Sequence, residues 1–342
     1  MEKIKVIQWF TGDIARHQIR VLSACTSMEL VGAFVFHEEK HGRDIGEIAG
    51  IEPQGIYASS KMEEVLALEA DCVLYNPPHE RYDEIIAILA SGKNVISIMA
   101  GWNPKKLPCY PDIVKACEQG NSSLYGTGLN PGLSYELALL GSSICTQVDS
   151  VYIKTCEPQA SLSPIFLEVF GFGQTEENLL NGNHPAYSIF ENLLQITDLL
   201  CEKLNIAHDG SRLVCEFEGA TQAYRDKIVV EPGTMAGLLV KAETVRDNVA
   251  VATIELRFLL GEEYVRAEFL EGRPKQGWIE VDVRGNPGSR LTHEVVFEHD
   301  SLGTWSTGTK AINAIPFVCA AAPGLLSPLD LPLPRMLDLS AG

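Results

Sequence analysis

The 342-residue sequence lacks the features that mark several other classes of protein. No apolar run approaches the ~20 residues of a membrane-spanning helix, and we expect no secretory signal. The nine cysteines form no Cys-x-x-Cys pair and no cluster with other ligands. We therefore expect free thiols, no metal site and a cytoplasmic location. The G-x-S-x-G and Walker motifs are also absent, which disfavours serine hydrolases, kinases and ATPases.

Positive charge is scarce as well. Lys and Arg number 27 against 45 Asp and Glu, which gives a formal net charge of −18. Such a surface repels phosphate backbones and anionic lipid headgroups, so we expect no nucleic-acid partner and no membrane association. The sequence is 46% hydrophobic and 21% charged, which suits a folded chain of two domains.

Short apolar segments alternate with helical patterns over the first 131 residues. Strands are expected near residues 5–9, 30–36, 71–75, 94–98 and 122–125. Apolar strands that alternate with helices are typical of a parallel sheet covered on both faces. This part of the sequence therefore predicts a doubly wound α/β domain of the Rossmann type over residues 1–131.

The pattern changes after residue 131. An apolar helix is expected over 132–144, and two more over 165–170 and 186–204. Segments with a period of two follow near 212–220, 235–245, 249–260, 264–270 and 278–283. They predict an α+β substrate domain with an open antiparallel sheet over 132–300. Residues 301–342, with a helix near 308–320, are expected to return to the first domain.

The turn after the first strand resembles a phosphate-binding turn. A dinucleotide fold places G-x-G-x-x-G/A here, so that the backbone and a helix N-terminus approach a pyrophosphate. Gly12 fills the close-approach position and Ala15 the helix-packing position, whereas Phe10 replaces the first glycine. An ordinary strand–turn–helix is the alternative. The predicted cofactor-binding residues of this turn are Thr11, Gly12, Asp13, Ile14 and Ala15.

The end of the second strand bears on the choice of cofactor. An acidic residue at this position holds the ribose hydroxyl of NAD, whereas this sequence has His37. His37 and Arg43, with Lys40, are suited to a 2′-phosphate, although two glutamates follow His37 and favour NAD. We predict NADP as the preferred cofactor and NAD as the alternative. A solvated loop of mixed charge remains possible for Lys40.

The ends of three further strands are expected to border the cofactor, because ligands bind at the carboxyl ends of parallel strands. Asn76 either contacts the cofactor or stabilises its own turn. The residues predicted at these strand ends are Asn76, Pro77, Ala100, Gly101, Asn130 and Pro131.

Several segments together resemble one family. They are residues 8–12 (QWFTG), 42–47 (GRDIGE), 126–132 (GTGLNPG), 171–174 (GFGQ), 313–316 (NAIP) and 329–332 (LDLP). The sequence resembles the dihydrodipicolinate-reductase-like NAD(P)-dependent oxidoreductases, which include 2,4-diaminopentanoate dehydrogenase and native amine dehydrogenases. The resemblance implies a homodimer and hydride transfer between a nicotinamide and a small carbonyl, imine or amine. It also implies that Asn313 contacts the cofactor.

One position departs from this family. The resemblance implies a glutamate that handles ammonia in the loop at residues 99–106, but this loop contains no carboxylate. Asn103 takes the corresponding place, and an amide cannot act as a general base. We therefore expect carbonyl, imine or alkene reduction, or amine oxidation through a different set of polar residues. Reductive amination by an amine dehydrogenase and a non-catalytic nucleotide sensor are the alternatives.

The remaining candidates lie in and near the second domain. Trp102, Phe166, Phe170 and Tyr187 form either a substrate pocket or part of a core. Glu168 is a partner for a substrate amine or a solvated carboxylate, and His184 is a proton donor or a structural loop residue. The candidate catalytic residues are therefore Asn103, Glu168 and His184.

Overall fold

The computed structural model describes residues 2–77, 79–160, 162–180, 184, 186–271, 278–294, 302–333 and 335–336. The chain forms two compact units. The first comprises Met1–Gly132 with Thr304–Gly342, and the second comprises Leu133–Gly303. No helix in the described ranges is long and apolar enough to cross a membrane. Those ranges also hold no group of three or more potential metal ligands.

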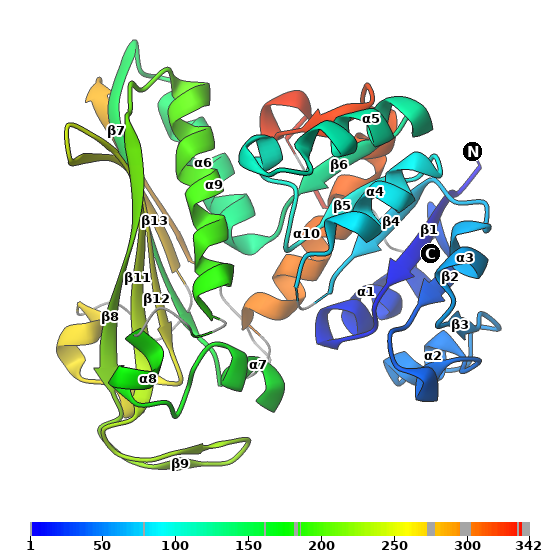
Figure 1. Ribbon diagram of the computed structural model, residues 1–342, viewed down its shortest axis with the longest axis horizontal. Coiled ribbons are helices and arrows are strands. Elements are labelled where there is room, and N and C mark those ends of the chain that lie inside the picture. Colours follow the sequence, from blue (N-terminus) through cyan, green and yellow to red (C-terminus); the bar gives the residue numbers. More distant parts are fainter. Residues whose placement is uncertain are drawn as a thin grey trace. The chain divides into compact units, whose positions relative to one another are not determined.

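A seven-stranded parallel sheet forms the centre of the first unit, which confirms the predicted doubly wound fold (Figure 1). Its strand order is β15-β6-β5-β4-β1-β2-β3. The strands are β1 (Ile4–Trp9), β2 (Met28–Phe34), β3 (Ala58–Ser59), β4 (Cys72–Tyr75), β5 (Asn94–Ser97), β6 (Ser123–Gly126) and β15 (Gly324–Leu326). The tail pattern does not predict β15, because three residues carry too little periodicity to indicate a strand.

Helices cover both faces of this sheet. One apolar core joins the sheet to α1 (Asp13–Ser23), α2 (Ile45–Ala49) and α10 (Leu302–Ala320). The other joins it to α3 (Met62–Leu66), α4 (Tyr82–Ala90) and α5 (Tyr110–Gly120). Strands buried on both faces need apolar side chains throughout, which explains their continuous apolar runs.

The second unit contains a six-stranded sheet of order β14-β13-β7-β12-β11-β8. Its strands are β7 (Gln147–Pro158), β8 (Gly210–Gly219), β11 (Met235–Arg246), β12 (Val249–Leu259), β13 (Trp278–Asn286) and β14 (Ser289–Glu294). The predicted antiparallel pairing holds for four of the five neighbouring pairs of strands, whereas β7 and β12 pair in parallel, so the sheet is mixed. A long excursion separates these two strands along the chain, and parallel pairing requires such a crossover. A small hairpin of β9 (Tyr224–Arg225) and β10 (Val229–Val230) lies apart from this sheet.

Two helices, α6 (Ser134–Ser142) and α9 (Ala186–Leu204), pack along one face of this sheet (Figure 1). The shorter α7 (Pro164–Val169) and α8 (Glu176–Leu180) precede α9. The strand predicted over residues 264–270 is wrong, because Glu262–Tyr264 and Ala267–Leu270 are 3-10 turns. The backbone N–H of Arg266 donates to the buried carboxylate of Glu218 at 2.9 Å. This N–H is therefore bonded to a side chain rather than to a neighbouring strand.

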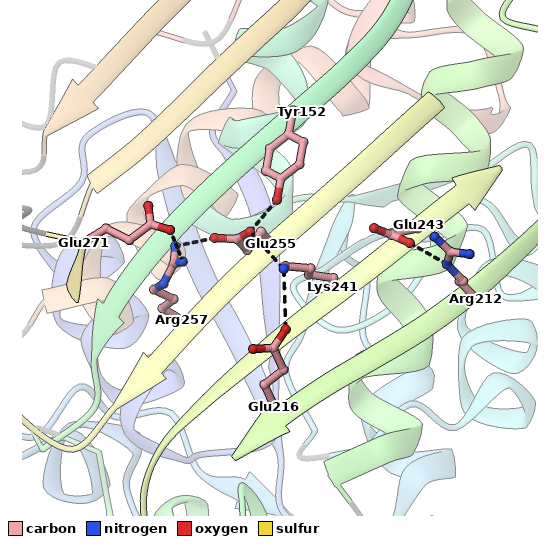
Figure 2. A network of polar contacts seen from close by, with 8 residues as sticks. All are labelled: Tyr152, Arg212, Glu216, Lys241, Glu243, Glu255, Arg257 and Glu271. Carbon is pink, nitrogen blue, oxygen red and sulfur yellow. Dashed lines mark hydrogen bonds and ion pairs between the residues drawn. The ribbon is translucent and has the colours of Figure 1, made fainter. Parts of the chain in front are cut away.

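The opposite face of the six-stranded sheet carries a network of charged side chains (Figure 2). Glu255, which is 2% exposed, accepts hydrogen bonds from the Tyr152 hydroxyl and from Arg257. Arg257 also donates to Glu271 at 2.6 Å, and Lys241 lies 3.8 Å from Glu255. Burial and the neighbouring Glu255 raise the pKa of Tyr152, so its hydroxyl stays protonated. The buried charges of this face are thus paired, as burial requires.

The contact between α4 and α5 gives a stability prediction. A methyl group at Gly120 would lie 1.8 Å from the carbonyl oxygen of Leu89, whereas one at Gly12 meets nothing within 4 Å. Gly120→Ala should therefore lower the free energy of unfolding by about 2–3 kcal/mol, because two helix backbones must separate. Gly12→Ala should change it by less than about 0.5 kcal/mol. Urea denaturation followed by circular dichroism measures both, and equal midpoints would contradict the prediction.

Candidate functional site

The turn between β1 and α1 has the open geometry that a phosphate ligand needs. Gly12 caps α1 in an extended conformation, with φ −75° and ψ −170°. The space in front of its Cα is clear, so a ligand can approach the backbone N–H groups of the first helical turn. Thr11 and Ala15 are buried beside it, and Asp13 and Ile14 are half-buried. The five residues predicted from the glycine turn therefore lie together at one helix N-terminus.

Phe10 holds the position of the missing first glycine. Its φ is +69°, in the left-handed region that favours glycine. Its N–H donates to the carbonyl of Phe34 at 2.9 Å, and its ring packs edge-on against Phe34 and Tyr75, with centroids 5.8 and 6.4 Å away. These contacts offset the cost of the backbone conformation, which is about 1–3 kcal/mol. The turn is thus formed by aromatic packing instead of by a glycine.

Cations lie beside the turn. The Nζ atom of Lys40 donates to the Thr11 hydroxyl at 3.2 Å. Burial and the nearby cations Arg16 and Arg43 lower the pKa of Lys40. The strand β2 ends at Phe34 rather than near residue 36, and the exposed His37 precedes the 3-10 turn Glu38–Lys40. Lys40, rather than His37, is therefore the residue that the structure bonds directly to the turn between β1 and α1.

Asn76, at the end of β4, forms hydrogen bonds with β1 and α1 and not only within its own turn. Its backbone N–H donates to the carbonyl of Trp9 at 3.3 Å, and its Nδ2 atom donates to the side chain of Gln18 on α1. Gln18 in turn donates to the carbonyl of Gly308 on α10 at 3.2 Å. The Oδ1 atom of Asn76 is buried and has no hydrogen-bond partner in the part of the chain that the structure describes. The neighbouring Pro77 is buried.

The ends of β5 and β6 meet through Ser97. Its hydroxyl accepts a hydrogen bond from Ala100 N–H at 2.9 Å, and its carbonyl accepts one from Thr127 N–H at 2.9 Å. Thr127 is 1% exposed, and within the described ranges its hydroxyl has no partner. Within the described ranges, the indole Nε1 of the half-buried Trp102 also has no hydrogen-bond partner. Unpaired buried polar atoms are costly in an isolated chain, so these atoms are suited to bind a water molecule or a ligand.

The remaining candidates of the first unit have clear positions. Gly101 has φ +86°, and a methyl group there would lie 2.9 Å from Leu124. Asn103 is 4% exposed. Pro131 is buried and Asn130 half-buried in a π-helical turn, Leu129–Leu133, whose first N–H donates to the Thr307 hydroxyl of α10 at 3.3 Å. Asn313 is half-buried on the same helix.

The candidates of the second unit do not all come together. Phe166 and Phe170 belong to an aromatic cluster with Phe190 of α9 and Phe258 of β12, where the centroids of Phe170 and Phe258 are 5.2 Å apart. Glu168 is exposed on α7. The half-buried His184 lies beside Gly171, and burial lowers its pKa. The side chain of Tyr187 lies outside the described residues.

Two residues that contact the candidate residues, Gln18 and Phe258, are not marked by any motif in the sequence. Gln18 is an ordinary helix residue by pattern, yet it links Asn76 to α10. Phe258 belongs to an alternating strand, where an aromatic residue predicts only burial. Both depend on contacts between segments far apart in the chain, which no local motif can reveal.

Comparisons with known proteins give a consistent result. Residues 136–341 match the family model of the 2,4-diaminopentanoate dehydrogenase C-terminal domain. The chain is 25% identical to 2,4-diaminopentanoate dehydrogenase of Acetoanaerobium sticklandii, an alignment that covers 98% of this chain and 96% of the other. It is 29% identical to an amine dehydrogenase of Streptomyces virginiae, where the alignment covers 43% of this chain and spans only 44% of that relative.

A solved structure shares the fold. The amine dehydrogenase of Mycobacterium smegmatis matches with a TM-score of 0.79 and 19% identity, over 98% of this chain and 97% of that one.

The unpaired hydroxyl of Thr127 gives a prediction that separates a ligand-binding role from a structural one. Thr127→Val should leave the ligand-free protein as stable or about 1 kcal/mol more stable, because it removes an unsatisfied buried group. The same change should weaken NADPH binding about tenfold, since one hydrogen bond is lost. Urea denaturation and a fluorescence titration with NADPH measure the two effects.

Thr244 supplies the matched control. Its hydroxyl is bonded to Thr197 and Asp198, each at 2.9 Å. Thr244→Val should therefore destabilise the protein by about 1–3 kcal/mol, because partners are left unpaired. If Thr127→Val destabilises the ligand-free protein as Thr244→Val does, its hydroxyl has a structural role instead.

Proposed function

Because this chain belongs to the 2,4-diaminopentanoate dehydrogenase family, we propose that it transfers hydride between a nicotinamide and a small amine or the corresponding imine or carbonyl compound. It is an NAD(P)-dependent oxidoreductase. One structural observation carries the proposal: two buried polar atoms, Asn76 Oδ1 and Thr127 Oγ1, stay unpaired within the described ranges at the ends of β4 and β6. Ligands bind at such strand ends in this fold.

The residues present fit a dinucleotide. The backbone around Gly12 and the first turn of α1 would hold the pyrophosphate, since nothing obstructs that approach. Asn76 and Thr127 would hydrogen-bond the nicotinamide half, with Asn130 and Asn313 as further proposed contacts. The bound cofactor supplies or accepts the hydride at its nicotinamide ring.

The side chains near β5 suggest which reaction is catalysed. Asn103 is buried where the resemblance implies a glutamate, and an amide orients a substrate but transfers no proton. We therefore propose that the protein reduces an imine to an amine, or oxidises an amine to an imine, without activating free ammonia. His184 is the proposed proton donor, and burial lowers its pKa. Glu168 is the proposed partner of the substrate amine.

The activity is tested with NADPH and a panel of cyclic imines, of ketones with ammonia, and of primary amines with NADP⁺. We expect NADPH to be consumed with imines and formed with amines, with no dependence on added ammonia. Turnover of ketones only when ammonia is present would instead assign reductive amination. Tight NADPH binding without any turnover would favour a sensor and end the proposal.

The cations near the phosphate turn support NADP as the preferred cofactor. Lys40 lies at hydrogen-bond distance from Thr11, with Arg16 and Arg43 close enough to lower its pKa. Three cations around one turn suit the added 2′-phosphate of NADP. His37 is a further proposed contact, because it lies just before the turn that carries Lys40.

Lys40→Ala should weaken NADPH binding about tenfold and NADH binding much less, since one charge-assisted hydrogen bond to phosphate is lost. The lysine binds phosphate only when protonated, so NADPH affinity of the wild type should fall as pH rises through the lowered pKa of Lys40. The variant should show a flatter pH response. Lys115→Ala, on the exposed face of α5, is the control. Equal losses for NADPH and NADH would contradict the assignment.

We further propose a cytoplasmic homodimer with small-molecule substrates and no nucleic-acid or membrane partner. The nine cysteines are free, which suits a reducing compartment, and the net charge of −18 disfavours phosphate backbones. The charged face of the six-stranded sheet is the proposed dimer contact, because the side chains of Arg212 and Glu216 on this face are 43% and 60% exposed and can reach a second copy (Figure 2).

Sedimentation equilibrium tests the dimer. Val214 is 36% exposed and is paired with Lys241 in the sheet register. Val214→Asp should weaken dimerisation, because it adds an unpaired acid to this face. Val229→Asp, at an exposed position of β10, is the matched control. A monomer at micromolar concentration in the wild type would contradict the proposal.

A further inference from the structure

A fully buried glutamine connects the end of β4 to α10. Gln18 lies on α1, and its side chain is not exposed to solvent. Its Nε2 atom donates to the carbonyl of Gly308 at 3.2 Å, and its Oε1 atom accepts a hydrogen bond from Nδ2 of Asn76. Burying an amide is costly unless its polar groups are bonded, and here both ends of the amide are. Gln18 is therefore held by two other segments of the chain.

The contact with α10 determines which way the amide of Gln18 points. A backbone carbonyl only accepts hydrogen bonds, so the amide nitrogen of Gln18 has to face Gly308. Gly308 allows the two helices to approach closely, because a methyl group there would lie 3.3 Å from Cγ of Gln18 and 3.1 Å from Cγ2 of Ile14. The amide oxygen of Gln18 is then left to face the end of β4.

The orientation of Gln18 in turn determines that of Asn76. An amide oxygen accepts hydrogen bonds but donates none, so the amide nitrogen of Asn76 has to face Gln18. A reversed Asn76 amide would place two oxygen atoms against each other. The other arm of this amide is the Oδ1 atom, which is buried and has no hydrogen-bond partner in the part of the chain that the structure describes. Two hydrogen bonds in series thus make Asn76 offer an acceptor.

An acceptor at this strand end restricts the groups that can bind to it. A carbonyl oxygen attracts O–H and N–H groups and repels phosphate oxygens, which are acceptors as well. The pyrophosphate of a dinucleotide is therefore unsuited to Asn76 Oδ1. In the nicotinamide half of the cofactor, the groups that can donate are the ribose hydroxyls and the carboxamide NH2.

We infer that Gln18 is a positioning residue, which orients Asn76 so that its Oδ1 atom accepts a hydrogen bond from a donor group in the nicotinamide half of the cofactor. The inference rests on the proposed function, because it requires a nicotinamide cofactor. Gln18 does not contact the ligand, since both ends of its amide are bonded to the protein. Its effect on binding should therefore disappear when the side chain of Asn76 is removed.

The test measures the binding of three ligands by isothermal titration calorimetry. NADPH carries both kinds of donor, 2′-phospho-ADP-ribose keeps the ribose but lacks the carboxamide, and adenosine 2′,5′-bisphosphate lacks both. Gln18→Met keeps the length of the side chain but loses both hydrogen bonds, so it should weaken NADPH binding about fivefold. The affinity for adenosine 2′,5′-bisphosphate should stay unchanged. A loss for 2′-phospho-ADP-ribose assigns the donor to the ribose, and unchanged binding assigns it to the carboxamide.

A double-mutant cycle separates positioning from a general structural effect. Asn76→Ala should weaken NADPH binding about tenfold, and adding Gln18→Met should change that affinity by less than about twofold. Gln18→Glu should bind NADPH within about twofold of the wild type at about pH 6. Burial favours the neutral acid, whose hydroxyl can donate to Gly308 and whose carbonyl can accept from Asn76.

Thr309→Val is the matched control. The Thr309 hydroxyl is hydrogen-bonded to Nε2 of His17 at 2.8 Å, so this change removes a neighbouring contact between α1 and α10 without affecting Asn76. It should lower the melting temperature and leave all three affinities unchanged. Gln18→Asn is too short to reach both partners and provides a second variant in case Gln18→Met does not fold. It should show the same losses as Gln18→Met.

Three results would overturn the inference and leave the proposed function intact. They are unchanged NADPH binding in Asn76→Ala, losses for Gln18→Met and Asn76→Ala that add fully in the double variant, and an equal loss for adenosine 2′,5′-bisphosphate. If the wild type does not bind NADPH, the proposed function fails and this inference fails with it.

Discussion

The conformation of one turn, between β1 and α1, is the constraint on which the first unit depends. The chain must turn sharply after Trp9 and leave the N-terminus of α1 open, which requires a positive φ at residue 10. Glycine adopts this conformation without strain, but here a phenylalanine does so. Its ring contacts Phe34, Phe36 and Tyr75, from both strands that neighbour β1. The sheet therefore has to assemble before this turn is stable.

Two kinds of buried polar group occur in this structure, charged groups that are paired and neutral atoms that are not. In the second unit, buried charges are paired: Glu218 with Arg266, and Glu255 with Arg257. In the first unit, Asn76 Oδ1 and Thr127 Oγ1 remain unpaired within the described ranges, at the ends of β4 and β6, which lie on either side of β5. Pairing favours stability, whereas an unpaired group at a strand end favours a ligand. This contrast separates the structural polar groups from those suited to binding.

The family assignment and the site agree on the class of reaction and differ in one chemical detail. The predicted family and NAD(P)-dependent oxidoreduction are confirmed by the family match over residues 136–341. Asn103 nevertheless provides an amide where the resemblance implies a carboxylate. A change from acid to amide keeps the size of a polar group but removes its proton transfer. The resemblance implies that this position handles the substrate rather than the cofactor.

Local patterns in the sequence determined much of the fold. The helix predicted over residues 186–204 is α9, and the strands predicted near 235–245 and 249–260 are β11 and β12, because apolar periodicity is a local property. The glycine turn also predicts a phosphate site at the N-terminus of α1. Only the tertiary structure decided the parallel pairing of β7 with β12, the 3-10 turns over residues 262–270 and the conformation of Phe10. Each depends on a contact with a residue distant in the chain, such as Glu218 for Arg266 or Phe34 for Phe10. A local sequence pattern cannot identify such a distant residue.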